Sequence, residues 1–177
     1  MLTREKFLEL LGDLAVTFAH LEILVSGIMA LLIDEKVLLP GFIVASRQST
    51  RWKLRRIRRL AGMPWHTQRR ERVREFVNRV GKQLCLRNLF IHGVWTMDEA
   101  DMSQDLVTVL DLDPSPAPEG KQWHTMRPEQ YDYYELEARL AAVSELIGEA
   151  LDIIHDLNPN VWAPAEGKAP AGGEAAD

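Results

Sequence analysis

The chain has 177 residues, of which 46% are hydrophobic and 27% are charged. These values fit one ordinary globular domain with a real core, and they exclude a disordered or fibrous chain. The single cysteine excludes an intramolecular disulfide, and no secretion leader opens the sequence, so we expect a cytoplasmic location.

The formal net charge of −5 conceals a strong segregation of charge along the chain. Residues 47–87 carry 14 of the 21 Lys and Arg against two acids, which gives this stretch a local charge of +12. Such a segment can gather phosphates. Alternatively, its arginines coat the solvated faces of two helices and pair with the acidic second half of the chain.

The first predicted element is a long helix. Apolar residues recur at spacings of three and four from Phe7 to Leu32, which predicts about seven turns with Thr3 as the N-cap. Residues 14–33 are apolar enough to be considered as a membrane span. His20 and Glu22 at the centre would be costly in lipid, so we interpret the segment as a buried core helix without membrane contact.

Two further helices are predicted in the basic segment. Pro40 and Gly41 indicate a turn, after which residues 42–60 are predicted to form a helix that Gly62 and Pro64 end. Thr67 is predicted to cap a third helix that runs to His92. The second helix is expected to bury Val44, Leu54, Ile57 and Leu60, and the third to bury Val73, Phe76, Val77, Val80, Leu84 and Ile91.

The periodicity changes after Gly93. Residues 94–97 and 106–112 are predicted to be strands, and residues 122–126 a third short strand. Pro128 suits the first turn of a last helix, because proline needs no hydrogen-bond partner there. That helix is expected to carry an apolar stripe of Leu136, Leu140, Val143, Ile147, Leu151, Ile154 and Leu157.

These elements predict a single, mainly α domain over residues 1–160. It is an up-down helical bundle with a small β-hairpin or short sheet, at about 93–126, between the third and last long helices. Residues 161–177 are rich in Ala, Gly, Pro and Glu, so we expect a disordered tail.

Three residues with complementary chemistry lie at the end of the third predicted helix. Arg87 is a permanent cation, Asn88 a carboxamide and His92 an imidazole that titrates near neutral pH. Asn88 and His92 are four residues apart and therefore share one helix face. Gly93 is a good helix terminator, so His92 falls in the last turn, where the helix dipole favours its charged form.

Arg87, Asn88 and His92, followed by Gly93, resemble the signature of the HEPN superfamily, in which an Arg precedes a His by four to six residues. The resemblance implies a helical bundle that pairs into a homodimer, and in many members a metal-independent RNA-cleaving site; other members are inactive. It also favours Glu22 of the first helix as the partner of Arg87, although Glu22 could instead point to water. The chain departs at Val94, where one branch of toxins carries a Tyr, so that branch's regulation through the Tyr is not carried over.

The motif predicts attack by a ribose 2′-hydroxyl on the neighbouring phosphate. His92 would act as base or acid, Arg87 would stabilise the phosphorane, and Asn88 would orient the imidazole or hold an oxygen. A two-fold dimer would supply the second histidine. RNA would bind along the outward arginines of the basic segment, which are Arg47, Arg51, Arg55, Arg58 and Arg59.

The predicted function is therefore an endoribonuclease, as a toxin or defence effector with an antitoxin or regulatory protein as a further partner. No cofactor or metal is expected. Two alternatives stay open: an inactive HEPN-like module that binds RNA, a nucleotide or a partner protein, and a purely structural pair of Arg87 with Glu22. Trp52, Trp65 and Trp95 could stack on unpaired bases, but core or interface positions are the commoner use of such residues.

Overall fold

The computed structural model describes residues 3–34, 38–64, 69–92, 94–96, 106–110 and 128–159. Their secondary structure is mainly helical, with one small antiparallel sheet placed before the last long helix, as predicted. In chain order the elements are α1 (Arg4–Ile33), α2 (Leu38–Ser46), α3 (Thr50–Ala61), α4 (Arg70–His92), β1 (Val94–Thr96), β2 (Leu106–Leu110), β3 (Pro128–Asp132) and α6 (Tyr133–Leu157). The predicted third strand at residues 122–126 and the predicted tail lie outside the described residues.

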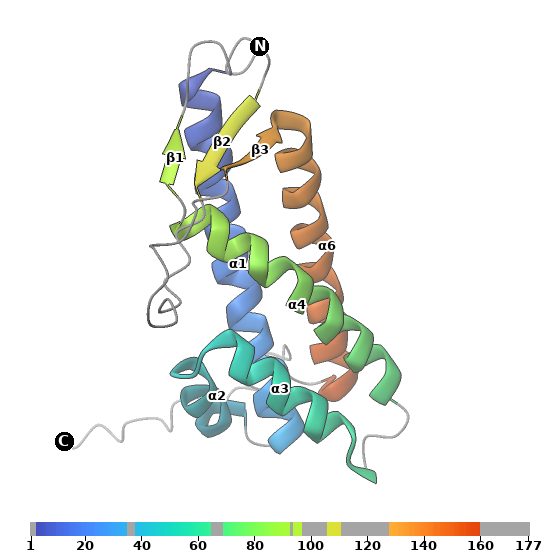
Figure 1. Ribbon diagram of the computed structural model, residues 1–177. Helices are drawn as coiled ribbons and strands as arrows, with labels where there is room; N and C mark the ends of the chain where they lie inside the picture. The colour runs from blue at the N-terminus through green and yellow to red at the C-terminus, as the bar shows by residue number, and fades with distance from the viewer. Residues whose placement is uncertain are drawn as a thin grey trace, which may run out of the picture.

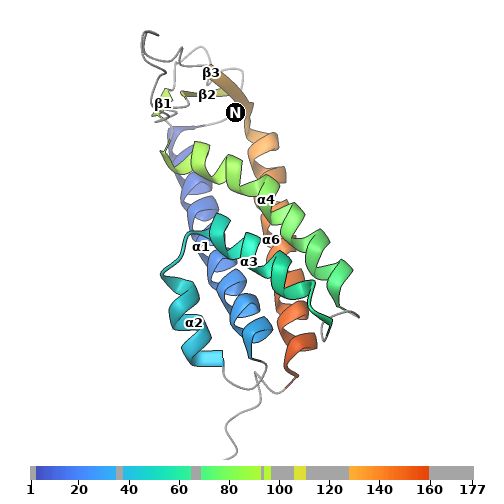
Figure 2. The ribbon, with the colours of Figure 1, turned by 60° about the horizontal axis from the view of Figure 1, so that its bottom comes forward.

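The long first helix is the centre of the molecule. α1 packs against α2, α3, α4 and α6, and α4 crosses α1 and α6 in both ribbon views (Figures 1 and 2). Thr3 caps it as predicted, with its hydroxyl accepting from the backbone N–H of Lys6 at 3.3 Å. By length and composition α1 would also pass as a membrane span, as core helices of soluble proteins do; 56% of its most apolar 18-residue window is buried inside the protein.

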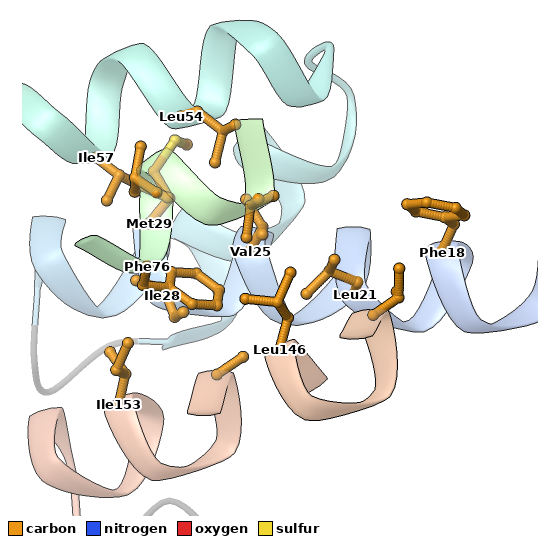
Figure 3. Close-up of a cluster of buried hydrophobic side chains, with 14 of the residues drawn as sticks. Phe18, Leu21, Val25, Ile28, Met29, Leu54, Ile57, Phe76, Leu146 and Ile153 are labelled. Atoms are coloured by element: carbon orange, nitrogen blue, oxygen red, sulfur yellow. The ribbon is translucent and has the colours of Figure 1, made fainter. Parts of the chain in front are cut away.

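The core is built from the apolar faces of four helices (Figure 3). Val25 and Ile28 of α1 meet Ile57 of α3, Phe76 of α4 and Leu146 of α6, and all five side chains are buried. Burying a side chain of this size stabilises the fold by roughly 1.5–3 kcal/mol. The core therefore fixes how α1, α3 and α4 lie relative to one another.

The chain between α1 and α3 differs from the prediction. Pro40 and Gly41 do not form a turn but lie inside α2, where proline is tolerated because it falls in the first helical turn. The predicted helix over residues 42–60 is broken at 47–49 into α2 and α3. Ser49 starts the second piece by accepting from the backbone N–H of Trp52 at 3.3 Å.

The burial of these two helices follows the prediction on α3 but not on α2. Leu54, Ile57 and Leu60 are buried as expected, whereas Val44 is 57% exposed. The break at 47–49 rotates α2 out of the helical register that would have turned Val44 inward. Gly62 ends α3, as predicted, with its N–H bonded to Arg59 and Leu60 carbonyls.

The predicted third helix corresponds to α4, which begins at Arg70 and ends at His92 as predicted. Its predicted cap Thr67 and the side chain of Ile91 lie outside the described residues. The expected buried positions are confirmed, with Leu84 half-buried, and the last turns also bury two residues that the pattern missed, Leu89 and Phe90.

The sheet has the strand order β1-β2-β3 with both pairs antiparallel. The first two strands are where the sequence predicts them, with Trp95 opposite Val109. The third starts at Pro128, so the prediction of Pro128 in a helix was wrong. Proline is accepted there because it is the first residue of an edge strand. α6 instead begins after Asp132, whose carboxylate accepts from the backbone N–H of Glu135 at 2.6 Å.

The apolar stripe of α6 is confirmed at most positions and wrong at one. Leu136, Val143, Ile154 and Leu157 are buried, and Leu140 and Ile147 pack against the core while partly buried. Leu151 is exposed, and the neighbouring residues Leu146, Ala150 and Ile153 are buried instead.

An aromatic cluster joins the sheet to the end of α4. The ring of Trp95 stacks on Phe90 at 5.4 Å and meets Phe7 of α1 at 5.0 Å, and its Nε1–H donates to the carbonyl of Phe90 at 3.0 Å. Tyr131 of β3 approaches Phe90 edge-on at 5.4 Å. Trp95 is therefore a core residue, the commoner of the two uses considered for it, and its contacts hold the last turn of α4 against α1.

Candidate functional site

Arg87 is held between residues of two helices. Its Nη2 lies 3.5 Å from Oε1 of Glu22 on α1, which confirms the predicted pair. Its Nη1 donates to the side-chain oxygen of Asn88 at 3.1 Å. The side chains of Arg87 and Glu22 are 26% and 28% exposed, so the pair lies at the surface of the core and is open to one side. Two contacts on different sides give the guanidinium a fixed direction.

Among the described residues, the guanidinium keeps donors that have no partner. Arginine has five N–H donors, and Glu22 and Asn88 take two of them. The buried Nε of Arg87 has no hydrogen-bond partner among the described residues. Unpaired buried donors of this kind are unfavourable. The N–H groups of Nη1 and Nη2 that neither Glu22 nor Asn88 takes are the donors with which Arg87 can bind an anion from its open side.

A pocket of about 260 Å³ lies at this open side; we call it the Arg87 pocket. One wall is Glu22, Leu84, Arg87 and Asn88, and the other is formed by residues 48–51 at the start of α3. The first backbone N–H groups of a helix have no partner inside the helix, and the helix dipole makes this end positive. Arg51, Arg87 and the start of α3 thus surround one small volume with positive charge.

A buried lysine lies behind Glu22. Lys53 of α3 is only 4% exposed, and its ammonium donates to Oγ of Ser26 at 2.8 Å. Ser26 in turn donates to the carbonyl of Glu22 at 2.8 Å. Burial lowers the pKa of Lys53, and the nearby Glu22 carboxylate opposes that shift. Lys53 thus helps to balance the charge of Glu22 from the core side.

Lys53 is not among the predicted site residues, although the sequence contains a signal for it. Lys53 precedes Ile57 by four residues and Leu60 by seven, so it falls on the buried stripe of α3. A charge at such a position needs a polar partner, which Ser26 supplies.

The predicted motif is brought together in part. Arg87 and Asn88 contact each other, and Glu22 joins them from α1. The backbone of His92 ends α4, one turn after Asn88, while its side chain lies outside the described residues. The approach of the imidazole to the Arg87 pocket therefore stays a prediction.

The arginines of the basic segment divide into two groups. On α4, Arg72 pairs with Asp152 at 3.3 Å and with Asp156, and Arg79 pairs with Glu149. All three acids belong to α6, so Arg72 and Arg79 pair with the acidic second half of the chain, whereas Arg74 pairs with Glu71 of α4 itself. The pairs of Arg72 and Arg79 also attach α4 to α6.

The arginines at α3 behave differently. Arg47, Arg51, Arg55, Arg58 and Arg59 are all exposed, as predicted. Arg58 donates to the side-chain oxygen of Asn78 at 2.7 Å. Within the described ranges, none of these five arginines has a carboxylate at ion-pair distance. The described part of the chain therefore leaves the positive charge of these arginines without a neutralising carboxylate.

The described part of the chain contains no group of three or more His, Cys, Asp or Glu side chains that could hold a metal ion. No protein-family model matches the sequence, and neither a curated protein nor a solved structure is significantly similar to it. The fold and the site thus define a mainly helical protein with a cationic pocket between α1, α3 and α4.

Proposed function

We propose that this protein is a metal-independent endoribonuclease of the HEPN type. The observation that carries the proposal is the position of Arg87, held by Glu22 and Asn88 at the wall of a cationic pocket and five residues before His92. A phosphodiester suits this pocket because a guanidinium and a helix start both bind phosphate oxygens. The exposed arginines of α3 add the charge that attracts an RNA backbone.

The proposed reaction is transesterification within RNA. A base removes the proton of a ribose 2′-hydroxyl, the oxygen attacks the adjacent phosphorus, and the bond from phosphorus to the 5′-oxygen breaks. An acid protonates that leaving oxygen, so the products are a 2′,3′-cyclic phosphate and a 5′-hydroxyl. His92 would move one of these protons. Arg87 would stabilise the charge on the phosphorane, and the amide nitrogen of Asn88 would hold an oxygen of the substrate.

A homodimer belongs to this proposal because one imidazole cannot serve as base and acid in the same step. A two-fold axis would bring two copies of the motif together. α1, which carries Glu22, also exposes Val16 and Ile23 by more than half of their surface. Exposed apolar residues beside a site suit contact with a second copy. A cytoplasmic toxin or defence effector, controlled by an antitoxin or another regulatory protein, is the role that we propose for such an enzyme.

The test is incubation of the purified protein with total RNA in EDTA. We expect cleavage that leaves 2′,3′-cyclic phosphate ends and that Arg87→Ala or His92→Ala abolishes while the helical circular dichroism is retained. Matched controls are Arg70→Ala, at the other end of α4, and His155→Ala, exposed on α6; both should cleave normally. Cleavage that requires a divalent metal and survives both motif substitutions would overturn the proposal.

One observation favours the alternative of an inactive binding module. Glu22 lines the same pocket as Arg87 and satisfies part of its charge, which leaves less positive charge to stabilise a phosphorane, while the exposed arginines of α3 can still bind an RNA backbone. RNA binding that weakens with salt, without cleavage in any condition, would support this second function.

A further inference from the structure

α3 carries a second pocket, distinct from the Arg87 pocket. It has a volume of about 220 Å³ and is lined by Trp52, Arg55, Arg56 and Arg59; we call it the Trp52 pocket. These residues are spaced by three, four and seven positions from Trp52, so one face of a single helix supplies all of them. An aromatic ring and three guanidiniums therefore surround one hollow.

The indole of Trp52 has no aromatic or cationic partner within the described part of the protein. The side chain is 37% exposed, and within the described residues its ring contacts neither another aromatic ring nor a cation. The hydrogen bond of Trp52 to the cap residue Ser49 comes from its backbone N–H and leaves the ring uninvolved. A large ring left in this state offers a surface on which a planar group can stack.

The two pockets are connected by a row of cations. Arg51 lines the Arg87 pocket, while Arg55 and Arg59 line the Trp52 pocket. Successive members are four residues apart, so they lie one above the other along α3 over about 12 Å. In the part of the chain that is described, no carboxylate pairs with any of them. A chain of phosphates can follow this row from one pocket to the other.

We infer that the Trp52 pocket is a subsite for single-stranded RNA, in which an unpaired base stacks on Trp52 and the flanking phosphates bind Arg55, Arg56 and Arg59. The inference rests on the proposed function in taking RNA as the ligand. The ring and the cations together favour single-stranded RNA over two other ligands. The bases of a duplex stay stacked on one another, and an acidic peptide such as polyglutamate has no aromatic group that could stack on the indole. Stacking with cationic support is the common mode of binding unpaired strands.

The experiment measures binding without cleavage. A short fluorescein-labelled 2′-O-methyl RNA lacks the nucleophilic hydroxyl, and its binding to the full chain is followed by anisotropy in EDTA over a range of salt. We expect Trp52→Ala to weaken binding by about fivefold or more, with the salt slope unchanged, and Trp52→Phe to keep most of the affinity. Arg55→Gln should instead reduce the slope of log K against log salt by about 0.7.

Two controls match these variants in residue type. Tyr134→Ala removes another exposed aromatic ring, and Arg4→Gln removes an exposed arginine at the start of α1; neither should change affinity or slope. The inference is overturned if the oligonucleotide does not bind, if Trp52→Ala binds as the wild type does, or if polyglutamate or the matching duplex binds as tightly as the single strand.

The outcome is separable from that of the nuclease proposal. Loss of affinity in Trp52→Ala, with a wild type that never cuts RNA, supports the subsite and removes the enzyme. If the wild type cleaves RNA but Trp52→Ala binds the oligonucleotide as tightly as the wild type does, the nuclease proposal is supported and the subsite is overturned.

Discussion

At the scale of single residues, the site depends on opposite charges brought to one place from three helices. Glu22 comes from α1, Lys53 from α3 and Arg87 from α4. Lys53 approaches from the core, where water cannot screen it, and Arg87 from the pocket side. The carboxylate thus orients Arg87 while Lys53 offsets the cost of its partial burial.

The pair of Glu22 and Arg87 predicts a measurable coupling. Glu22→Gln and Arg87→Gln should each lower the free energy of unfolding, and the double variant should lose less than the sum of the two. Because the pair is about a quarter exposed, we expect a coupling of about 0.5–1 kcal/mol in a double-mutant cycle measured by urea unfolding. Strictly additive losses would show that the contact contributes nothing.

Lys53 predicts a dependence of stability on pH. Burial lowers its pKa in the folded protein below the ordinary 10.5. The unfolded chain therefore binds more protons between the two pKa values, and stability rises with pH through that window. The contribution of neutral Lys53 to stability is complete above pH 10.5 and is lost as the pH falls through the pKa that Lys53 has in the folded protein.

The measurement compares wild type with Lys53→Met in urea unfolding at several pH values. Met keeps most of the volume and cannot be charged, so titrations elsewhere in the protein cancel in the difference. We expect the stability of wild type relative to Lys53→Met to increase from neutral pH toward about pH 10, where an ordinary lysine titrates. A difference that does not change with pH would contradict the shift.

At the scale of elements, a local hydrogen bond defines the start of α3, and one close contact between helices holds α2 against α1. Ser49 caps α3, and this cap sets the end of the helix that faces the Arg87 pocket. α2 is held against α1 at Gly41, where a built Cβ would lie 3.1 Å from both Cα and Cβ of Ala30. Ala30 is fully buried in α1, so it has no room to move away.

Glycine substitutions test this close approach. Gly41→Leu should destabilise the protein by about 1–3 kcal/mol, because a side chain there must push α2 away from α1. Gly148 in α6 is the matched control, since a Cβ there would meet nothing within 4 Å. Gly148→Ala should stabilise by about 0.5–1 kcal/mol through helix propensity. Urea unfolding measures the stability of both variants. Equal changes in the free energy of unfolding at the two positions would refute the packing argument.

At the scale of the whole molecule, the sheet supports the site without lining the Arg87 pocket. Trp95 connects β1 with Phe90 of α4 and Phe7 of α1. Phe90 is two residues before His92 and three after Arg87, so the aromatic cluster holds the stretch that carries the motif. The orientation of the catalytic candidates is therefore coupled to the β insertion.

Removing the indole of Trp95 should reveal this coupling. Trp95→Ala is expected to lower the unfolding free energy by about 3 kcal/mol, because it leaves a cavity and breaks the bond from Nε1 to the carbonyl of Phe90. Tyr134→Ala, an exposed aromatic on α6, should change it by less than about 0.5 kcal/mol. Thermal unfolding followed by circular dichroism compares the two, and a loss in Trp95→Ala no larger than that in Tyr134→Ala would refute the role of the cluster.

The proposed dimer predicts that cleavage per chain falls on dilution. Ile23→Glu, on the exposed side of α1, should weaken self-association and lower activity at a given concentration without unfolding the chain. Val44→Glu on α2 introduces the same charge at a similarly exposed apolar residue and should leave both unchanged. Analytical ultracentrifugation gives the oligomeric state, and activity independent of concentration in a monomeric wild type would contradict the dimer.

Much of the fold was predictable because it depends on patterns within single segments. Apolar spacing identified α1, most of α4 and α6, and the change to alternating residues after Gly93 identified β1 and β2. Three of the failures are at Pro40, Gly41 and Pro128. From the sequence, Pro40 and Gly41 are interpreted as a turn and Pro128 as the start of a helix. The element in which each residue lies depends instead on packing against a neighbouring helix or strand.

The sequence by itself determined the long helices, the cap at Thr3 and the basic character of α3, because local spacing and local hydrogen bonds settle such features. The resemblance favoured the pair of Glu22 and Arg87 over a Glu22 that points to water, and the structure confirms the pair. Only the tertiary structure decided that α6 neutralises arginines of α4, whereas those of α3 meet no carboxylate among the described residues, and that Lys53 supports the site from the core. Partners far apart in the sequence are chosen by packing in three dimensions, and no local pattern records that choice.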